Sequence, residues 1–297
     1  MIAPIKHGYT YFPGCSLTAT NRSYDLSTRA VAEALDIELK ELEDWNCCGA
    51  TAYMAINEKR SFVLSARNLA LAEKEGRDIV TVCNGCYLVL RKTNKYISED
   101  SHLKRDVLDA LAAGGMSYGG TVAVRHFLDV IIRDLGEHHV RERIVHPLDG
   151  LKVASYYGCQ IGRPFGEIDD EEDPQLMDTL VEWMGGERVN YPLKSRCCGG
   201  MMMTTQPELG KMMTGRILLN ARKSGADCII TTCPLCQINL EAGQKAVSKA
   251  MGEDCRIPVL YFTQLLGVAL GLGPEALALK DCFTPVRDLL AEKVGIR

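Results

Sequence analysis

Hydrophobic positions along this chain fall into two kinds of segment that alternate from one end to the other. Short runs rich in Val, Ile, Tyr and Phe, bounded by Gly, Pro, Asn or Asp, indicate buried strands. Longer segments with apolar residues every three or four positions indicate helices with one buried face. Strands that alternate with such helices are typical of βαβ units and a parallel sheet. The predicted strands are residues 9–12, 37–42, 78–82, 121–125, 153–157, 188–191, 227–232 and 259–262.

The predicted helices fill the intervals between these strands. Asn21 or Ser23 can cap the first of them, and Gly76 ends the helix predicted for residues 57–75. Residues 138–150 are rich in His, Arg and Glu, and we expect a polar linker there. The other helices are predicted for residues 87–95, for the segment that starts at His126, and for residues 174–184 and 201–224.

The second half of the chain repeats the order of elements in the first half. A chain of 297 residues is also too long for one typical core and fits two domains of about 150 residues. We therefore expect an α/β protein of two pseudo-symmetric repeats, each with a small parallel sheet flanked by helices. The predicted domains are residues 1–145 and residues 146–297.

Cysteine distribution supports the same repeat. Of the 13 cysteines, ten form two sets of five in which a single cysteine, a Cys-Cys-Gly and a CxxC follow one another. The Cys-Cys pairs are 150 residues apart, and so are the CxxC motifs. Each element follows a predicted strand, and ligands of open α/β sheets bind at that edge. The first set is Cys15, Cys47, Cys48, Cys83 and Cys86, and the second is Cys159, Cys197, Cys198, Cys233 and Cys236.

Composition narrows the classes of function. The net charge of −4, without a basic run, predicts no nucleic-acid partner. No uninterrupted apolar stretch reaches about 18 residues, so no membrane span is expected. Residues 1–6 carry no apolar leader, which favours a cytoplasmic protein. In that reducing compartment, clustered cysteines bind metal more often than they form disulfides.

Five thiols in each set favour a multi-iron cluster over a single zinc ion, because zinc takes four ligands in a tetrahedron. Neighbouring cysteine side chains tend to diverge, so a Cys-Cys pair suits a cofactor with several metal atoms. Zinc at one site, or an incompletely filled site, remains an alternative. The three cysteines outside the repeat are expected to pack as small buried hydrophobes, and they are Cys228, Cys255 and Cys282.

The repeated pattern of Cys-Cys-Gly and CxxC resembles the cysteine-rich CCG domain family. A chain of two such domains resembles the B subunit of heterodisulfide reductase. The resemblance implies that each set of five cysteines holds one noncubane 4Fe–4S cluster. It also implies an oxidoreductase of methanogenic energy metabolism, which reduces the mixed disulfide of coenzyme M and coenzyme B to two thiols.

The same resemblance implies partners, because the chain lacks a ferredoxin cysteine run and a GxGxxG flavin motif. They are a ferredoxin-like C subunit and a flavin-containing A subunit, and either a hydrogenase or a formate dehydrogenase would feed the complex. Two alternatives remain. Related CCG chains act as electron-transfer or accessory subunits of complexes that oxidise lactate, glycolate or succinate, and a zinc-stabilised interaction scaffold is the other possibility.

The substrate that the resemblance implies is anionic, and cations beside the cysteines are candidates to bind it. Arg163, Lys194 and Arg196 are the candidates in the second half. Arg22 and Arg125 are the candidates in the first half. His126 either donates protons to a leaving thiolate or ends a strand, and the second role is favoured. Residues 201–203, all Met, are expected to pack in the core rather than bind metal.

Overall fold

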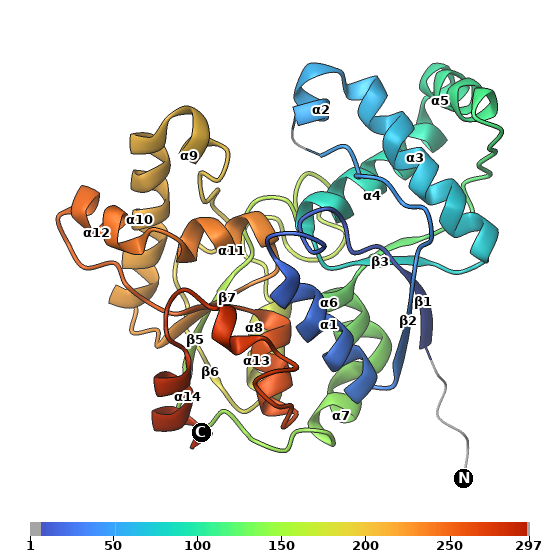
Figure 1. The fold of residues 1–297 in the computed structure, drawn as a ribbon. Coiled ribbons are helices and arrows are strands. Elements are labelled where there is room, and N and C mark those ends of the chain that lie inside the picture. Colours follow the sequence, from blue (N-terminus) through green and yellow to red (C-terminus); the bar gives the residue numbers. More distant parts are fainter. Residues whose placement is uncertain (1–6, 51, 296–297) are drawn as a thin grey trace, which may run out of the picture.

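The computed structural model describes residues 7–50 and 52–295, and it contains two parallel sheets with the same strand order. The first has the order β2-β1-β3-β4, and the second has the order β6-β5-β7-β8. These sheets confirm the predicted α/β class with two repeats (Figure 1). The strands are β1 (His7–Tyr11), β2 (Ile37–Glu41), β3 (Ile79–Thr81), β4 (Val124–His126), β5 (Lys152–Tyr156), β6 (Glu187–Arg188), β7 (Cys228–Thr231) and β8 (Val259–Tyr261).

Helices connect consecutive strands in both halves. Those of the first half are α1 (Arg22–Ala34), α2 (Ala52–Ile56), α3 (Glu58–Glu75), α4 (Asn84–Glu99), α5 (Ser101–Ala113), α6 (Phe127–Asp129), the π-helical turn η1 (Val130–Leu135) and α7 (Gly136–Arg141). Those of the second half are α8 (Leu176–Trp183), α9 (Met202–Thr205), α10 (Pro207–Lys223), α11 (Pro234–Glu241), α12 (Gln244–Met251), α13 (Phe262–Ala269), the 3₁₀ turn η2 (Leu279–Asp281) and α14 (Arg287–Lys293).

Two predicted segments differ from the structure. The single helix predicted for residues 201–224 is broken into α9 and α10 at Gln206, whose φ is −141° and ψ is 73°. Pro207 causes the break, because proline lacks an N–H to donate and is tolerated only in the first turn of a helix. The polar linker predicted for residues 138–150 begins inside α7, where the Glu137–Arg141 ion pair of 2.7 Å spans one helical turn.

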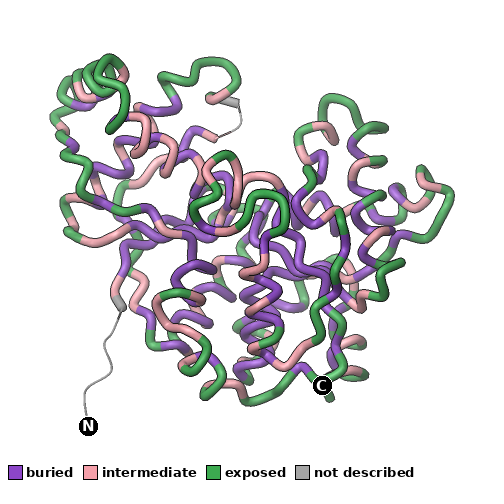
Figure 2. The backbone as a smooth tube through the Cα atoms, turned by 180° about the vertical axis from the view of Figure 1, so that it is seen from behind, coloured by how far each residue is buried: buried purple, intermediate pink, exposed green. Residues whose placement is uncertain are grey.

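The larger of two apolar clusters runs through both halves, and a smaller one lies within the second half. Leu69 and Phe127 from the first half belong to the same buried cluster as Leu180 and Phe262 from the second. Helix α1 of the first half packs against α13 of the second, and the two lie side by side in the middle of the molecule (Figure 1). Figure 2 shows buried backbone continuing through this junction. The division at residues 145 and 146 stays a prediction, and residues 1–6, on which the expected absence of a leader depends, lie outside the described part of the chain.

The strand order places each cysteine set at a switch point of its sheet. In the first sheet, β2 lies on one side of β1, whereas β3 and then β4 lie on its other side. The direction in which strands are added therefore reverses between β1 and β3. Ligands of open α/β sheets bind at this crevice beyond the carboxyl ends of the central strands. Cys15 follows β1 and Cys83 follows β3, so both cysteines lie at that position. Cys159 and Cys233 follow β5 and β7 in the same way.

Candidate metal centre

Two glycines allow the chain to turn sharply in front of the first cysteine of each set. Gly14, with φ of 76°, precedes Cys15, and Gly158, with φ of 70°, precedes Cys159. A Cβ atom at Gly14 would lie 2.8 Å from Cys86 Sγ, and one at Gly158 would lie 3.3 Å from Cys236 Sγ. Both the backbone angle and the close approach therefore require a residue without a side chain.

The two CxxC motifs open helices. Cys83 is the N-cap of α4 and Cys233 is the N-cap of α11. The free N–H groups of a helix's first turn and the positive end of its dipole stabilise thiolates. Among the CxxC thiols, the pKa is lowered at Cys83, while contacts with other thiols and burial raise it at Cys86 and Cys236.

Electrostatic interactions between neighbouring thiols link the ten cysteines in one continuous series. In the first half the order is Cys15, Cys47, Cys48, Cys86 and Cys83. In the second half the order is Cys159, Cys197, Cys198, Cys236 and Cys233. The two series join because the thiols of Cys83 and Cys233 shift each other's pKa. The structure thus brings both cysteine sets together at the junction of the two halves.

The two sets share the direction of the pKa shift at four of their five cysteines. The neighbouring Cys15 thiol lowers the pKa of Cys47 to about 2, and the neighbouring Cys159 thiol lowers that of Cys197 to about 2. The Gly199 N–H also donates to Cys197 Sγ over 3.4 Å. The same contacts raise the pKa values of Cys15 and Cys159. The sets differ at the first CxxC cysteine, since the pKa of Cys83 is lowered and that of Cys233 is raised.

The cysteine geometry suits a cofactor larger than one ion. Within residues 7–50 and 52–295, no group of three or more His, Cys, Asp or Glu side chains converges in a way that would hold a single metal ion. The contacts instead run from pair to pair, for example over 3.5 Å between Cys198 Sγ and Cys236 Sγ. Five thiols in an extended arc can reach different atoms of a multi-iron cluster, whereas one zinc ion needs a compact tetrahedron. The donor set therefore fits an iron–sulfur cluster.

Three cysteines lie outside this series. Cys228 is fully buried within β7, and Cys255 is buried as well. Burial raises the pKa of Cys228 to about 12. Cys282 is half-buried, and the Gln264 side-chain amide lies 3.8 Å from its Sγ. These thiols are protonated at neutral pH and do not contact the ten others.

The candidate substrate cations have different surroundings. Lys194 is buried, and its Nζ lies 2.6 Å from Asp173 and 3.3 Å from Asp178. Arg163 pairs with Glu172 over 3.4 Å, also on the loop before α8. Arg196 is exposed beside Cys197, and no carboxylate of the described residues pairs with it. Of these three candidates, Arg196 is thus the one without an ion pair to a described carboxylate, so its charge can serve an anionic ligand.

The first-half candidates divide in the same way. Arg22 is exposed at the start of α1, without an ion pair to the described carboxylates. Arg125 is held by Asp129 and Asp134 over 2.7 Å and 2.9 Å. His126 is fully buried, and burial lowers its pKa to about 4, so it is neutral at pH 7. Its Nδ1 accepts the Leu128 N–H, which leaves its Nε2–H to donate to the Val82 carbonyl over 3.1 Å.

Two buried amides bond across the junction of the halves. The Asn84 amide donates to the Tyr157 carbonyl over 2.9 Å, and the Asn21 amide donates to the Pro234 carbonyl over 3.0 Å. Nothing in the sequence indicates these bonds, although Asn84 lies inside a CxxC motif and Asn21 is a predicted helix cap. Asn21 is the N-cap residue of α1, but its side chain makes no capping hydrogen bond there.

The prediction that residues 201–203 pack in the core is wrong at Met201. This residue is 48% exposed, because it precedes α9, a helix without buried residues.

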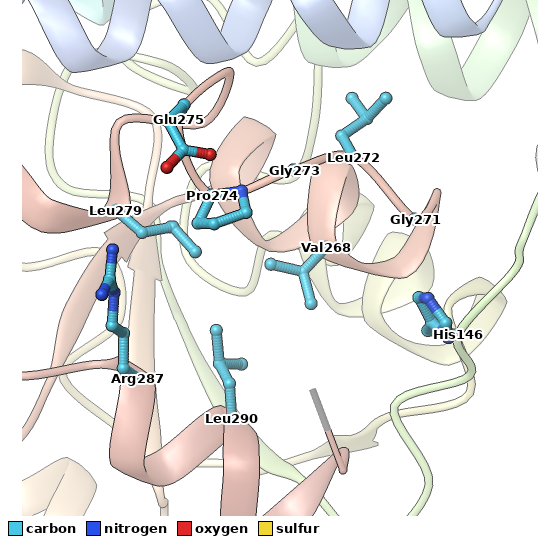
Figure 3. A pocket seen from close by; sticks show the side chains of 10 residues that line it. All are labelled: His146, Val268, Gly271, Leu272, Gly273, Pro274, Glu275, Leu279, Arg287 and Leu290. Atoms are coloured by element: carbon cyan, nitrogen blue, oxygen red, sulfur yellow. The ribbon is translucent and has the colours of Figure 1, made fainter. Parts of the chain in front are cut away.

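A cavity of about 330 Å³ lies elsewhere in the second half. Figure 3 shows it between His146, the end of α13 and α14. Val268, Leu279 and Leu290 form its apolar part, and none of the ten cysteines lines it. The chemistry of this chain is therefore assigned to the cysteine series and not to this cavity.

Comparison with known proteins supports the repeat. A family model described as a cysteine-rich domain, CCG, matches residues 9–91 and again residues 153–241. A solved structure described as a hypothetical protein from Helicobacter pylori has a TM-score of 0.76 over 95% of this chain, at 16% identity. This chain spans 53% of that structure's length, so the likeness concerns the fold alone.

Two similar relatives are components of different reductases. The chain is 35% identical over 276 residues, 91% of each protein, to the B subunit of the ferredoxin/F(420)H(2)-dependent CoB-CoM heterodisulfide reductase of Methanosarcina acetivorans. It is also 35% identical over 273 residues to the 8-methylmenaquinol:fumarate reductase membrane anchor subunit of Wolinella succinogenes, covering 91% of this chain and 95% of the relative. No described helix of this chain has both the length and the apolar character that a membrane crossing needs.

Proposed function

This chain belongs to the cysteine-rich CCG family and is related to the B subunits of heterodisulfide reductase, and on that premise we propose that it is the catalytic subunit of such a reductase. Its substrate would be the mixed disulfide of coenzyme M and coenzyme B. Each set of five cysteines would hold one noncubane 4Fe–4S cluster. The observation that carries the proposal is that Tyr24 Oη lies 2.9 Å from the Val82 carbonyl and 3.1 Å from the Thr232 carbonyl, because this brings together the loops that carry Cys83 and Cys233 from two complete cysteine sets.

The proximity of the sets matters for the electron balance. Cleavage of one S–S bond takes two electrons and two protons and yields two thiols, and two clusters held by the two sets would together supply the two electrons. Sets that lay on opposite surfaces could not serve one bond. Here the loops before Cys83 and Cys233 bond the same hydroxyl, that of Tyr24, which supports a substrate shared by both sets.

Residues around the cysteines would hold and shield the substrate. Cys48, Cys86, Cys198, Cys233 and Cys236 are buried, whereas Cys15 and Cys197 are exposed. The exposed members mark the side from which a substrate or an electron donor would approach. Arg196, next to Cys197, would bind an anionic group of the substrate by charge-assisted hydrogen bonds. His126 donates to a backbone carbonyl and is neutral at pH 7, so it would not supply the protons.

Partners follow from the same proposal. A ferredoxin-like C subunit and a flavin-containing A subunit would deliver electrons, in a cytoplasmic complex fed by a hydrogenase or a formate dehydrogenase. The second candidate function is an electron-transfer role in another oxidoreductase complex. This chain is as similar to a subunit of a fumarate reductase as to the heterodisulfide reductase subunit, at 35% identity in each case. That similarity supports the second candidate, because the name of the fumarate reductase subunit mentions no disulfide.

Anaerobic purification and assay test the proposal. We expect about eight irons per chain, four for each cluster, and reduction of the mixed disulfide by a reduced viologen dye. Eight irons without disulfide reduction would select the electron-transfer function. Stoichiometric zinc without iron would refute both candidates.

A further inference from the structure

One hydroxyl bonds to both CxxC loops where they meet. Tyr24 Oη lies 2.9 Å from the carbonyl oxygen of Val82 and 3.1 Å from that of Thr232. These residues directly precede Cys83 and Cys233, the first cysteines of the two CxxC motifs. Tyr24 is fully buried, so water does not compete for its hydroxyl. The single phenolic proton is therefore shared between two carbonyls that belong to different halves of the chain.

Packing fixes the position of this hydroxyl independently of the loops. The Tyr24 ring stacks on the ring of Tyr261, with centroids 3.8 Å apart and planes 6° from parallel. Phe262 meets the Tyr24 ring edge-on, at a centroid distance of 6.2 Å. One helical turn further along α1, Ser27 Oγ lies 2.7 Å from Thr263 Oγ1. Helix α1 is thus held against β8 and α13, and it presents a rigid donor to both loops.

The two halves differ in what else bonds these carbonyls. The Val82 carbonyl also accepts the Nε2–H of His126, a residue that pairs with Thr81 across the sheet. The register-matched residue of the second half is Tyr261, which pairs with Thr231. Its hydroxyl is directed to Gln237 over 3.3 Å and accepts the Asn21 amide. Among the described side chains, Tyr24 is the one that bonds the Thr232 carbonyl.

We propose that Tyr24 is a positioning residue that sets the separation of the two cysteine sets and thereby the electronic coupling between the clusters that they hold. The cluster part rests on the proposed function, while the positional part does not. A donor shared by both loops makes them move together. Loss of its hydroxyl would release the Thr232 loop most, because His126 still holds the Val82 carbonyl.

The matched variants are Tyr24→Phe and Tyr191→Phe. Tyr191 is also buried, and its hydroxyl donates to the Ser155 carbonyl over 3.3 Å, within the second half alone. Each variant loses one tyrosine hydroxyl that bonds backbone and keeps its ring. Their urea unfolding midpoints show whether the two losses destabilise the whole chain equally.

Hydrogen exchange of the full chain, purified anaerobically, tests the positional part. In Tyr24→Phe we expect exchange at the CxxC loops to rise about three- to tenfold, more at residues 233–237 than at residues 83–87, since a hydrogen bond is lost. In Tyr191→Phe both loops should exchange as in the wild type. Unchanged loops in Tyr24→Phe, or a rise spread evenly over the chain, would overturn the proposal.

Electron paramagnetic resonance of the reduced protein tests the cluster part. We expect wild type and Tyr191→Phe to show the same spin–spin interaction between two clusters, and Tyr24→Phe to show a weaker one at equal iron content. Wild-type coupling in Tyr24→Phe would overturn the inference and leave the proposed function standing. A wild type without two clusters would instead refute the proposed function, and the exchange measurement would still decide whether Tyr24 positions the loops.

Discussion

Cys83 and Cys233 interact through their thiols, although the two residues belong to different repeats of the chain. The interaction lowers the pKa of Cys83 and raises that of Cys233, so the two thiols do not act independently. Each residue is also the N-cap of a helix, α4 or α11. The junction therefore brings together two helix N-termini, and the positive potential of both stabilises the negative charge that thiolate ligands bring.

The first prediction separates ligand from core cysteines. Cys198→Ser should abolish most disulfide reduction and halve the iron content to about four per chain, because an alkoxide replaces soft sulfur poorly at iron. Cys282→Ser should leave both quantities near the wild type, since Cys282 is outside the series of ten. Iron analysis and the reductase assay measure these outcomes. Equal losses in the two variants would contradict the ligand assignment.

The second prediction concerns Lys194, whose side chain is 7% exposed beside Asp178, 5% exposed. Lys194→Ala leaves Asp178 buried without its cation, which typically costs about 3–5 kcal/mol of unfolding free energy. Lys211 provides the control, because Glu208, its partner over 2.5 Å, is 80% exposed. Lys211→Ala should change the unfolding free energy little, since exposed pairs contribute little. Urea titrations measure the unfolding free energy of both variants. Equal losses in Lys194→Ala and Lys211→Ala would show that the Lys194–Asp178 pair does not stabilise the fold.

The third prediction is a pH dependence caused by Glu241. Burial raises the pKa of this carboxyl from 4.5 to about 7, although the Thr284 N–H donates to it over 3.1 Å. The folded chain then binds a proton more tightly than the unfolded chain does. Between about pH 4.5 and pH 7 the unfolding free energy therefore falls as pH rises, by about 3 kcal/mol in total.

Glu241→Gln should remove this slope, because an amide does not titrate. The variant should match the wild type near pH 5 and exceed its stability at pH 8. Urea unfolding at both pH values gives the comparison, and Glu208→Gln, at an exposed position on α10, serves as the control. A difference between Glu241→Gln and wild type that is the same at pH 5 and pH 8 would contradict the assignment.

Local patterns in the sequence were sufficient for the fold class and for the two cysteine sets. Strand and helix periods predicted parallel sheets, and the positions of Cys15 and Cys83 after strands predicted one edge for both. The break at Pro207 was also visible in the sequence, and the single helix predicted there neglected it. The π-helical turn η1 had no such signal, because hydrophobic spacing does not distinguish it from an α-helix.

Contacts between the halves could not be predicted in this way. Tyr24 and Tyr261 are far apart in the sequence, and no local period indicates that α1 packs against α13. The charge partners of Lys194 could not be predicted either. Its burial beside Asp178 depends on how the loop before α8 folds back, which no local pattern indicates. Nearness to Cys197 in the sequence made Lys194 and Arg196 equivalent candidates, and the tertiary structure distinguishes them.

The last prediction concerns Arg196 and the charge of the substrate. Arg196→Ala removes one charge-assisted contact, so KM for the mixed disulfide should rise about ten- to a hundredfold. The effect should fall on KM rather than kcat, because the contact exists in the ground state and the transition state alike. Steady-state kinetics with charged and uncharged disulfides measure it, and uncharged disulfides should lose their disadvantage in this variant. Cluster spectra should stay unchanged, since arginine is not a ligand.

Arg256→Ala is the matched control, because Arg256 is an exposed arginine whose partner, Asp254, lies on the same loop. Its KM for the mixed disulfide should equal that of the wild type. Tyr156 Oη donates to the Arg196 carbonyl over 2.6 Å, so the backbone at this position is held whatever side chain is present. If Arg196→Ala leaves KM unaltered but weakens the spectrum of the second cluster, then the side chain supports Cys197 and the anionic group of the substrate binds elsewhere.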